Sequence, residues 1–427
     1  MKNSKKGFTL VELLVVIAIL AILATVAVVG YTSFTRKADI SNDTVIAGEL
    51  NTLLAATDVT DPIESFDDVK AALYANGFYL ANLNTKTEGC YFVWDKANNQ
   101  IILVDGEDNF KVLYSKVTPS ETKADWYFAV SDLSKVAAIK AEGYTVETIV
   151  TDLGTLKEAL AAGGEFHIDR SLVLDENNLL VFNSTTPIVF NLGDSPLNTS
   201  GVIGNPGDAL IPIEVIQGNV TLNGGYVSVA GGDINAHDLP IDVSMRTRKG
   251  SNVTIDGTVF DNSNSKGQIK IGGTATIKNT SIISNSYGIE TFYDGQITLE
   301  NTTIEANGNG IAVWACNYDH KSYEGGKGHT GNASITIKSG NYSGCGVSQF
   351  ALLTSCGGKI VIDGGDFTAP DGKMFAAGVN GTNNVIVING GTFNGVAFEN
   401  LTVDILQAMT VQGTVSWDAD LNCYIIQ

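Results

Sequence analysis

A long apolar segment with almost no charge stands near the N-terminus of the sequence. Between Phe8 and Phe34 the only charged residue is Glu12, and the uncharged stretch from Leu13 to Phe34 is 22 residues long. As a helix that rises 1.5 Å per residue, this stretch would be about 33 Å long, which is enough to cross a bilayer. Three lysines precede it, so the positive-inside tendency leaves the N-terminus in the cytoplasm. We predict a membrane helix here, with helical character continuing to about Ala56.

Weaker patterns follow this segment. Residues 67–76 alternate as a short amphipathic helix that Gly77 would end. Two short apolar runs, Cys90–Trp94 and Gln100–Val104, predict a hairpin. Residues 115–148 hold a charged stretch and only a weak helical pattern over Leu133–Ala141, so we interpret residues 116–150 as a joint between domains.

From about residue 165 the pattern changes to short period-two alternations that end in Gly or Asn. A nine-residue frame recurs, with apolar second, fourth and ninth positions and Gly, Asn, Ser or Thr at the sixth and seventh. The frames begin at Asn219, Asn252, Thr274, Gln296, Ser334, Lys359 and Val385, which are 33, 22, 22, 38, 25 and 26 residues apart. Such a repeat is too short for a βαβ unit and contains no helical stretch, so the strands must coil on themselves.

The repeat therefore predicts a parallel β-helix whose turns stack about 4.8 Å apart. Earlier alternations at Glu165–Leu174 and Pro187–Leu192 fit its first turns. We expect the helix Leu156–Ala162 to cap one end and Leu401–Gln427, with strands at 413–417 and 423–426, to cap the other. Over residues 165–400 the pattern resembles the right-handed, pectate-lyase-like β-helix superfamily, a resemblance that implies architecture rather than activity.

The N-terminal residues carry a more specific resemblance. The segment Gly7-Phe8-Thr9-Leu10-Val11-Glu12, followed by an unbroken apolar helix, resembles the prepilin signature of type IV pilins and secretion pseudopilins. The resemblance implies cleavage after Gly7 by a prepilin peptidase and methylation of the new amine of Phe8. It also implies that Glu12 pairs with the terminal amine of a neighbouring subunit during assembly. The helix-then-hairpin order of residues 57–115 loosely resembles the small head of pilins.

Two other readings of the apolar segment remain, a secretory signal peptide and a simple anchor with Glu12 in the headgroup region. The apolar run is long for a signal peptide, and its small-residue cleavage candidate at 24–27 is poor. Both readings explain less of the motif than the pilin-like one does.

Composition agrees with a protein that works outside the cytoplasm. There are 46 Asp and Glu against 26 Lys and Arg, which argues against nucleic-acid binding. The 5 cysteines form no disulfide framework in a chain of 427 residues, and the odd number leaves at least one without an intramolecular partner. The cysteine content therefore says little about whether the protein works in an oxidising or a reducing compartment.

One pair of cysteines invites a specific hypothesis. Aligning Gly310–Cys316 with Phe350–Cys356 as equivalent strands of neighbouring turns puts Cys316 and Cys356 in one column. Residues stacked in this way are close enough for a disulfide. A reduced cysteine ladder is an equally acceptable interpretation.

Candidates for catalysis are scattered. A lyase needs a cation site with a basic residue, and a hydrolase needs carboxylates that face each other. The lyase candidates are Asp233, Asp238, Asp242, Arg246, Arg248 and Lys249, and the hydrolase candidates are Glu290, Asp294 and Asp319. None of them forms a recognisable motif, so we assign no catalytic residue, metal or cofactor, and we expect no enzyme.

A long insert between two frames, residues 317–332, is more plausible as a binding loop. Its aromatic, charged and histidine side chains can contact a sugar or a protein. The candidate contacts are Tyr318, Asp319, His320, Lys321, Tyr323 and His329.

These patterns predict an N-terminal transmembrane α-helix with a small α+β pilin-like head, then an all-β right-handed parallel β-helix. The expected boundaries are 1–7 for a leader, 8–56 for the assembly helix, 57–115 for the head, 116–150 for the joint and 151–427 for the β-helix with its caps. We expect a minor pilin or pseudopilin that passes through the membrane to the cell surface, joins other pilin subunits and displays the β-helix as an adhesive head. The competing class is a membrane-tethered polysaccharide lyase or hydrolase.

Overall fold

The computed structural model describes residues 10–80, 83–168, 172–174, 180–199, 213–229, 243–263, 268–285, 287–307, 310–316, 332–344, 352–370, 372–379 and 383–427. The chain divides into two compact units. The first comprises Met1–Val130 and Lys135–Val146, and the second comprises Ser131–Ser134 and Glu147–Gln427.

The first unit is built on one long helix, α1 (Leu10–Thr57, 48 residues). Helix α2 (Phe66–Ala75) begins at a capping box, in which the Ser65 and Asp68 side chains each accept from the other's backbone N–H. The prediction of a short amphipathic helix here is confirmed, and Gly77 follows it with a φ of 79°. Within the described residues, no helix was found that is long and apolar enough to cross a membrane.

An antiparallel sheet completes this unit, with strand order β3–β2–β1–β4. Its strands are β1 (Cys90–Asp95), β2 (Gln100–Asp105), β3 (Lys111–Tyr114) and β4 (Trp126–Val130). Short 3-10 turns, η2 (Lys96–Asn98) and η3 (Lys123–Asp125), lie between strands. The predicted hairpin is confirmed as β1 and β2.

The structure differs from the sequence interpretation over residues 116–150. Strand β4 pairs with β1 instead of forming a joint, and α3 (Leu133–Ala141) follows it. Phe128, Ile139 and Tyr144 are buried in the same core as the hairpin residues Val93 and Ile102. The alternation of buried and partly buried residues in β4 is only five residues long. So short a pattern does not identify a strand by itself, and β4 is recognisable only through its pairing with β1.

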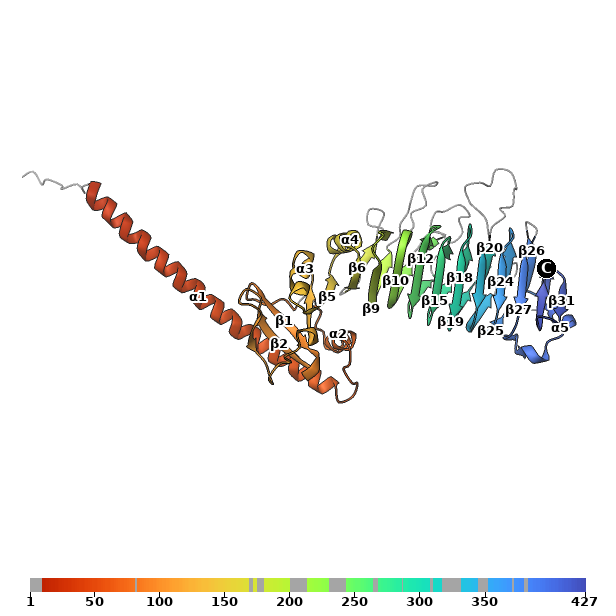
Figure 1. Cartoon of the computed structure of the whole chain (residues 1–427), viewed down its shortest axis with the longest axis horizontal. Coiled ribbons are helices and arrows are strands. Elements are labelled where there is room, and N and C mark those ends of the chain that lie inside the picture. Colours follow the sequence, from red (N-terminus) through yellow and green to blue (C-terminus); the bar gives the residue numbers. More distant parts are fainter. Residues whose placement is uncertain are drawn as a thin grey trace, which may run out of the picture. The chain divides into compact units, whose positions relative to one another are not determined.

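The second unit is a coil of parallel strands (Figure 1). Each turn from residue 251 onward has three strands, which form three columns along the coil. The first column contains β12 (Ser251–Asp256), β15 (Thr274–Lys278), β18 (Gln296–Glu300), β21 (Ser334–Ile337), β24 (Lys359–Ile362) and β27 (Val385–Ile388). The second contains β13 (Val259–Asn262), β16 (Ser281–Ser284), β19 (Thr302–Ala306), β22 (Gly340–Gly344), β25 (Asp366–Thr368) and β28 (Thr392–Phe393).

The third column contains β11 (Val243–Thr247), β14 (Gln268–Ile271), β17 (Ile289–Thr291), β20 (Val313–Cys316), β23 (Leu352–Ser355) and β26 (Phe375–Val379). The first turns consist of β5 (Thr145–Val150), β6 (Gly164–Ile168), β7 (Leu172–Leu174), β8 (Leu180–Asn183), β9 (Ile188–Thr199) and β10 (Ile213–Val229). Strand β10 contributes to all three columns, because it pairs with β11, β12 and β13.

The predicted nine-residue frame gives the observed register. Asn219 pairs with Asn252, Asn252 with Thr274, and the match continues to Lys359 with Val385. The second, fourth and ninth positions point into the core, as predicted: Val253, Ile255 and Phe260 are each 0% exposed. This arrangement is an all-β parallel fold consistent with a β-helix.

Both ends of the coil carry additional elements. Helix α4 (Leu153–Ala162) buries Leu156 and Ala159 against the first turns. At the other end are β29 (Val396–Ala397), η5 (Phe398–Asn400), α5 (Val403–Met409), β30 (Thr410–Gln412), β31 (Val415–Asp418) and β32 (Cys423–Ile426). Strand β32 pairs antiparallel with β27 and so covers the last edge of the first column. Additional elements therefore lie in both segments where the sequence predicts caps.

Candidate assembly helix and its clasp on the head

The first half of α1 presents apolar side chains to its surroundings. Among the described residues from Leu10 to Phe34, the large apolar side chains are between 44% (Val16) and 77% (Leu10) exposed. Covering one Leu or Ile side chain stabilises by about 1.5–3 kcal/mol, so this surface favours association with an apolar partner. Gly7 and Phe8 lie outside the described residues, as does the side chain of Glu12.

The second half of α1 packs on the head. Ala47, Leu50 and Leu54 are each at most 1% exposed. Three polar residues, Arg36, Asp43 and Asn51, also contact the head, and we call them the helix clasp. Their spacings of 7 and 8 residues are each about two helical turns, so all three lie near one face of the helix.

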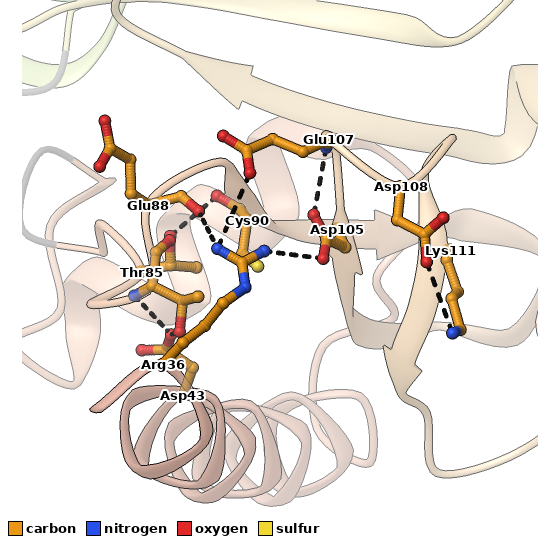
Figure 2. Close-up of polar contacts among 10 residues, drawn as sticks. Arg36, Asp43, Thr85, Glu88, Cys90, Asp105, Glu107, Asp108 and Lys111 are labelled. Carbon is orange, nitrogen blue, oxygen red and sulfur yellow. Dashed lines mark hydrogen bonds and ion pairs between the residues drawn. The ribbon is translucent and has the colours of Figure 1, made fainter. Parts of the chain in front are cut away.

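Arg36 forms the first contact of the clasp (Figure 2). Its guanidinium donates to the Asp105 carboxylate at 2.8 Å and to the Glu88 carbonyl at 3.0 Å. Burial alone would raise the pKa of Asp105, but the hydrogen bond from Arg36 and backbone N–H donors bring that pKa below its ordinary value. The exposed Glu107 carboxylate lies 3.8 Å from the Arg36 guanidinium and adds electrostatic attraction.

Asp43 forms the second contact and is fully buried. Its carboxylate accepts from the backbone N–H of Lys86 at 2.8 Å and of Thr87 at 3.0 Å. The Thr87 hydroxyl donates to it as well, at 2.7 Å. A buried carboxylate needs such donors to offset its lost hydration, and here they come from the loop before β1.

Asn51 forms the third contact, on the central strand β2. Its side-chain amide donates to the Ile101 carbonyl and accepts from the Ile101 N–H, both at 2.7 Å. Asn51 is 4% exposed, so both bonds are shielded from water. The clasp therefore fixes the register and rotation of α1 on the head, while the described apolar side chains of the first half of the helix stay exposed.

Sequence reasoning missed the clasp. It predicted the helix but gave no role to polar residues in its second half. A usable signal is present: Asp43 and Asn51 stand among apolar residues on the face that carries Ala47, Leu50 and Leu54.

The disulfide hypothesis rested on an alignment that is wrong by one residue. Cys316 pairs with Ser355, and Cys356 comes after the strand with a φ of 53°. Because Cys356 lies in the corner after β23, the two cysteines do not share a column. No disulfide joins them in the structure.

The catalytic candidates that the structure describes are engaged in separate ion pairs. Arg246 and Arg248 both bind Glu214, at 2.6 and 2.7 Å, and Lys249 binds Asp294 at 2.7 Å. Glu290, 1% exposed, contacts Lys270 at 3.3 Å and accepts from Gln268. Thus Glu290 and Asp294 have different partners.

Several other candidates fall outside the described residues. Asp233, Asp238 and Asp242 do so, as do the proposed loop contacts Tyr318, Asp319, His320, Lys321, Tyr323 and His329.

Comparison with known proteins decides the nature of the N-terminus. A family model described as a prokaryotic N-terminal methylation motif matches residues 2–28. The N-terminus is type IV pilin-like. This motif is typical of exported pilins, and it implies processing by a prepilin peptidase and assembly with other pilins. Neither the curated proteins nor the solved structures gave a match.

Proposed function

We propose that this protein is a minor type IV pilin-like subunit that carries its coil of parallel strands as a binding head at the cell surface. The observation that carries the proposal is the methylation motif at residues 2–28, which leads into a helix with an exposed apolar first half and a clasped second half. A subunit that polymerises through the first half of a helix needs the second half to be held on its own small head, as the clasp does here.

The proposed mechanism of export and assembly uses three residues. Prepilin peptidase cleaves after Gly7, the new amine of Phe8 is methylated, and the uncharged run 13–34 holds the subunit in the membrane. Glu12 then pairs with the terminal amine of a neighbouring subunit. Each of these charges is costly alone in an apolar bundle, while the pair is tolerated.

The binding role belongs to the second unit, which we propose to be a right-handed, pectate-lyase-like β-helix. Residues 151–427 make up most of the chain, so a filament in which every subunit carried this domain would be crowded. A minor or tip position relieves that crowding.

Processing and incorporation give the direct test. Gly7→Val should leave the leader in place, and mass spectrometry of the wild-type protein should show a methylated Phe8 at the N-terminus. Glu12→Leu should be processed normally but be absent from sheared filaments. Thr25→Leu, a substitution in the same apolar helix, serves as the control that still assembles.

Immunogold labelling locates the subunit. Gold at filament tips or at sparse positions supports the minor role, whereas uniform labelling along filaments contradicts it. Turnover of pectic or related glycans by the protein, with or without calcium, would instead favour a polysaccharide lyase or hydrolase; binding without turnover favours the adhesive head.

A further inference from the structure

The later turns of the coil contain a groove at the corner between the first and second columns. Its volume is about 740 Å³, and the described residues that line it come from four successive corners and from the segment after β28. We call it the corner groove.

Glycine forms the floor of this groove. The corners at Gly340, Gly364–Gly365 and Gly390–Gly391 stack on one another and carry no side chains. Stacking requires small residues there, because a Cβ on Gly390 would lie 2.5 Å from the Asp363 carbonyl oxygen. The two preceding corners are different, since Asn279 and Asn301 make their turns with φ of 51° and 46° and keep their side chains.

That change of corner type creates a step along the coil. Asn301 donates to Asn279 at 2.9 Å, so the two preceding corners are occupied by a hydrogen-bonded pair of amide side chains. In the next turn the corner is at Gly340, and the pair of amide side chains is not continued. The groove is therefore bounded by Asn301 at one end.

The other end is closed by the segment after β28. Strand β29 folds back antiparallel on β28, and the Phe398 N–H donates to the Gly391 carbonyl at 2.9 Å. The Phe398 ring packs edge-to-face against Tyr424, with centroids 5.8 Å apart. The partly buried Phe398, one of the residues that line the groove, is thus held in place.

One wall is a regular row of polar side chains. Asn341, Asp366 and Thr392 pair in register on β22, β25 and β28 and face outward. Behind them, the rings of Tyr342, Phe367 and Phe393 stack in the core with centroids 5.1 and 4.9 Å apart. This buried stack holds the row rigid, at one polar side chain per turn.

The composition of the groove selects a class of ligand. Its described lining residues include two acids, Asp366 and Glu399, and no Lys, Arg or His, which disfavours an anionic ligand. Within the described part of the chain, Asn341, Asp366 and Glu399 form no side-chain hydrogen bond, and all three residues are exposed to solvent. Hydroxyl groups are the complementary partners, and a fixed aromatic face suits the apolar face of a sugar ring.

We propose that the corner groove binds a neutral polysaccharide lying along the coil axis, with Asn341, Asp366 and Thr392 bonding successive hydroxyls and Phe398 contacting one sugar ring. A polymer with a repeating unit suits a wall that repeats with every turn. The proposal rests on the proposed function, since it assigns the ligand of the binding head.

The test uses the full chain in detergent micelles and three neutral probes: dextran, mannan and xyloglucan. Asn341→Trp places a large ring across the groove at an exposed position. Ser281→Trp is the matched control, because Ser281 occupies the same column two turns earlier and does not line the groove. Thermal unfolding of both variants checks that the fold is intact.

We expect at least one neutral probe to bind, and Asn341→Trp to weaken that binding by about tenfold or more while Ser281→Trp leaves it unchanged. Asp366→Asn, which keeps the shape and removes the charge, should weaken it by a smaller factor. Polygalacturonate should bind more weakly than the neutral probes.

The proposal fails if no neutral probe binds, or if a neutral probe binds equally well to the Asn341→Trp variant. It also fails if the only probe that binds is oligolysine, a cationic peptide, and Asn341→Trp abolishes that binding. Filament incorporation and cell adhesion are measured separately. If filaments that contain the Asn341→Trp variant still mediate adhesion, the corner groove is not the binding site, but the proposed function of the second unit as a binding domain is unaffected. If the wild-type protein never enters filaments, the proposed function itself fails.

Discussion

At the scale of single residues, buried polar side chains decide how the long helix sits on the head. Apolar residues such as Leu50 and Leu54 stabilise the packing of the helix but do not fix its register, because the hydrophobic effect is non-directional. Asn51 fixes the register of α1 on β2, since its two hydrogen bonds to the Ile101 backbone can form at one register only. The same reasoning applies to Asp43.

Asn51→Ala should therefore destabilise the first unit strongly. The change leaves the N–H and carbonyl of Ile101 buried without their partner, which we expect to cost roughly 2–4 kcal/mol of unfolding free energy. Denaturant unfolding measures it. Thr52→Ala removes a neighbouring exposed hydroxyl and should have little effect; equal losses in both variants would contradict the role of Asn51.

Asp105 should make the first unit sensitive to acid. Its folded-state pKa is depressed, so its contribution is complete above the unfolded pKa, near 4, and is lost as pH falls through the folded value. Unfolding free energies between pH 7 and pH 3 should fall less steeply for Asp105→Asn than for the wild type. Asp61→Asn, at an exposed site, should retain the wild-type slope.

At the scale of elements, the stacked rings of Tyr342, Phe367 and Phe393 join three turns of the coil. Phe367→Ala should cost about 3–5 kcal/mol, because it removes the middle ring and leaves a cavity between two others. Phe367→Leu should cost less, since it fills most of the space. Chemical unfolding compares the two, and similar losses would show that the stack itself contributes little.

The frame that repeats along the coil could be predicted because its information is local. Period-two alternation and a Gly or Asn corner determine which residues face inward, so the sequence correctly predicts that Val253, Ile255 and Phe260 are buried. The third column is less regular in sequence, and there the alignment of Cys316 slipped by one residue. Corners of different length separate these strands, so sequence spacing alone does not give their register.

Strand β4 and helix α3 illustrate the opposite case. Their patterns are short and weak, and their partners lie on β1 and in the core around Phe128 and Tyr144. Only tertiary pairing identifies them as part of the head. The candidate site divides in the same way, because the N-terminal motif is contiguous in sequence, whereas the clasp and the corner groove join distant residues.

At the scale of the whole molecule, the end caps should keep the coil from pairing with other chains. Strand β32 occupies the edge of β27, and an uncovered edge of this kind templates association. Removing residues 402–427 should convert the detergent-solubilised protein to large oligomers, measured by chromatography with light scattering. Ile425→Pro, which disrupts the same pairing, should do so partially.

The control for that experiment lies in the same segment. Leu421 is 69% exposed and lies in the turn before β32, so Leu421→Ser changes the surface without touching the pairing with β27. Its elution should match the wild type. Oligomers in this variant would point to surface stickiness rather than to an open edge.

The helix clasp has a mechanical consequence. Arg36, Asp43 and Asn51 hold the head at three levels along one face of α1, over about 22 Å of helix. Tension along the helix axis therefore strains all three contacts in shear and at the same time, instead of peeling them apart in sequence. A subunit pulled by its bound surface would yield as a single step at high force, with the head leaving the helix only when the whole row gives way.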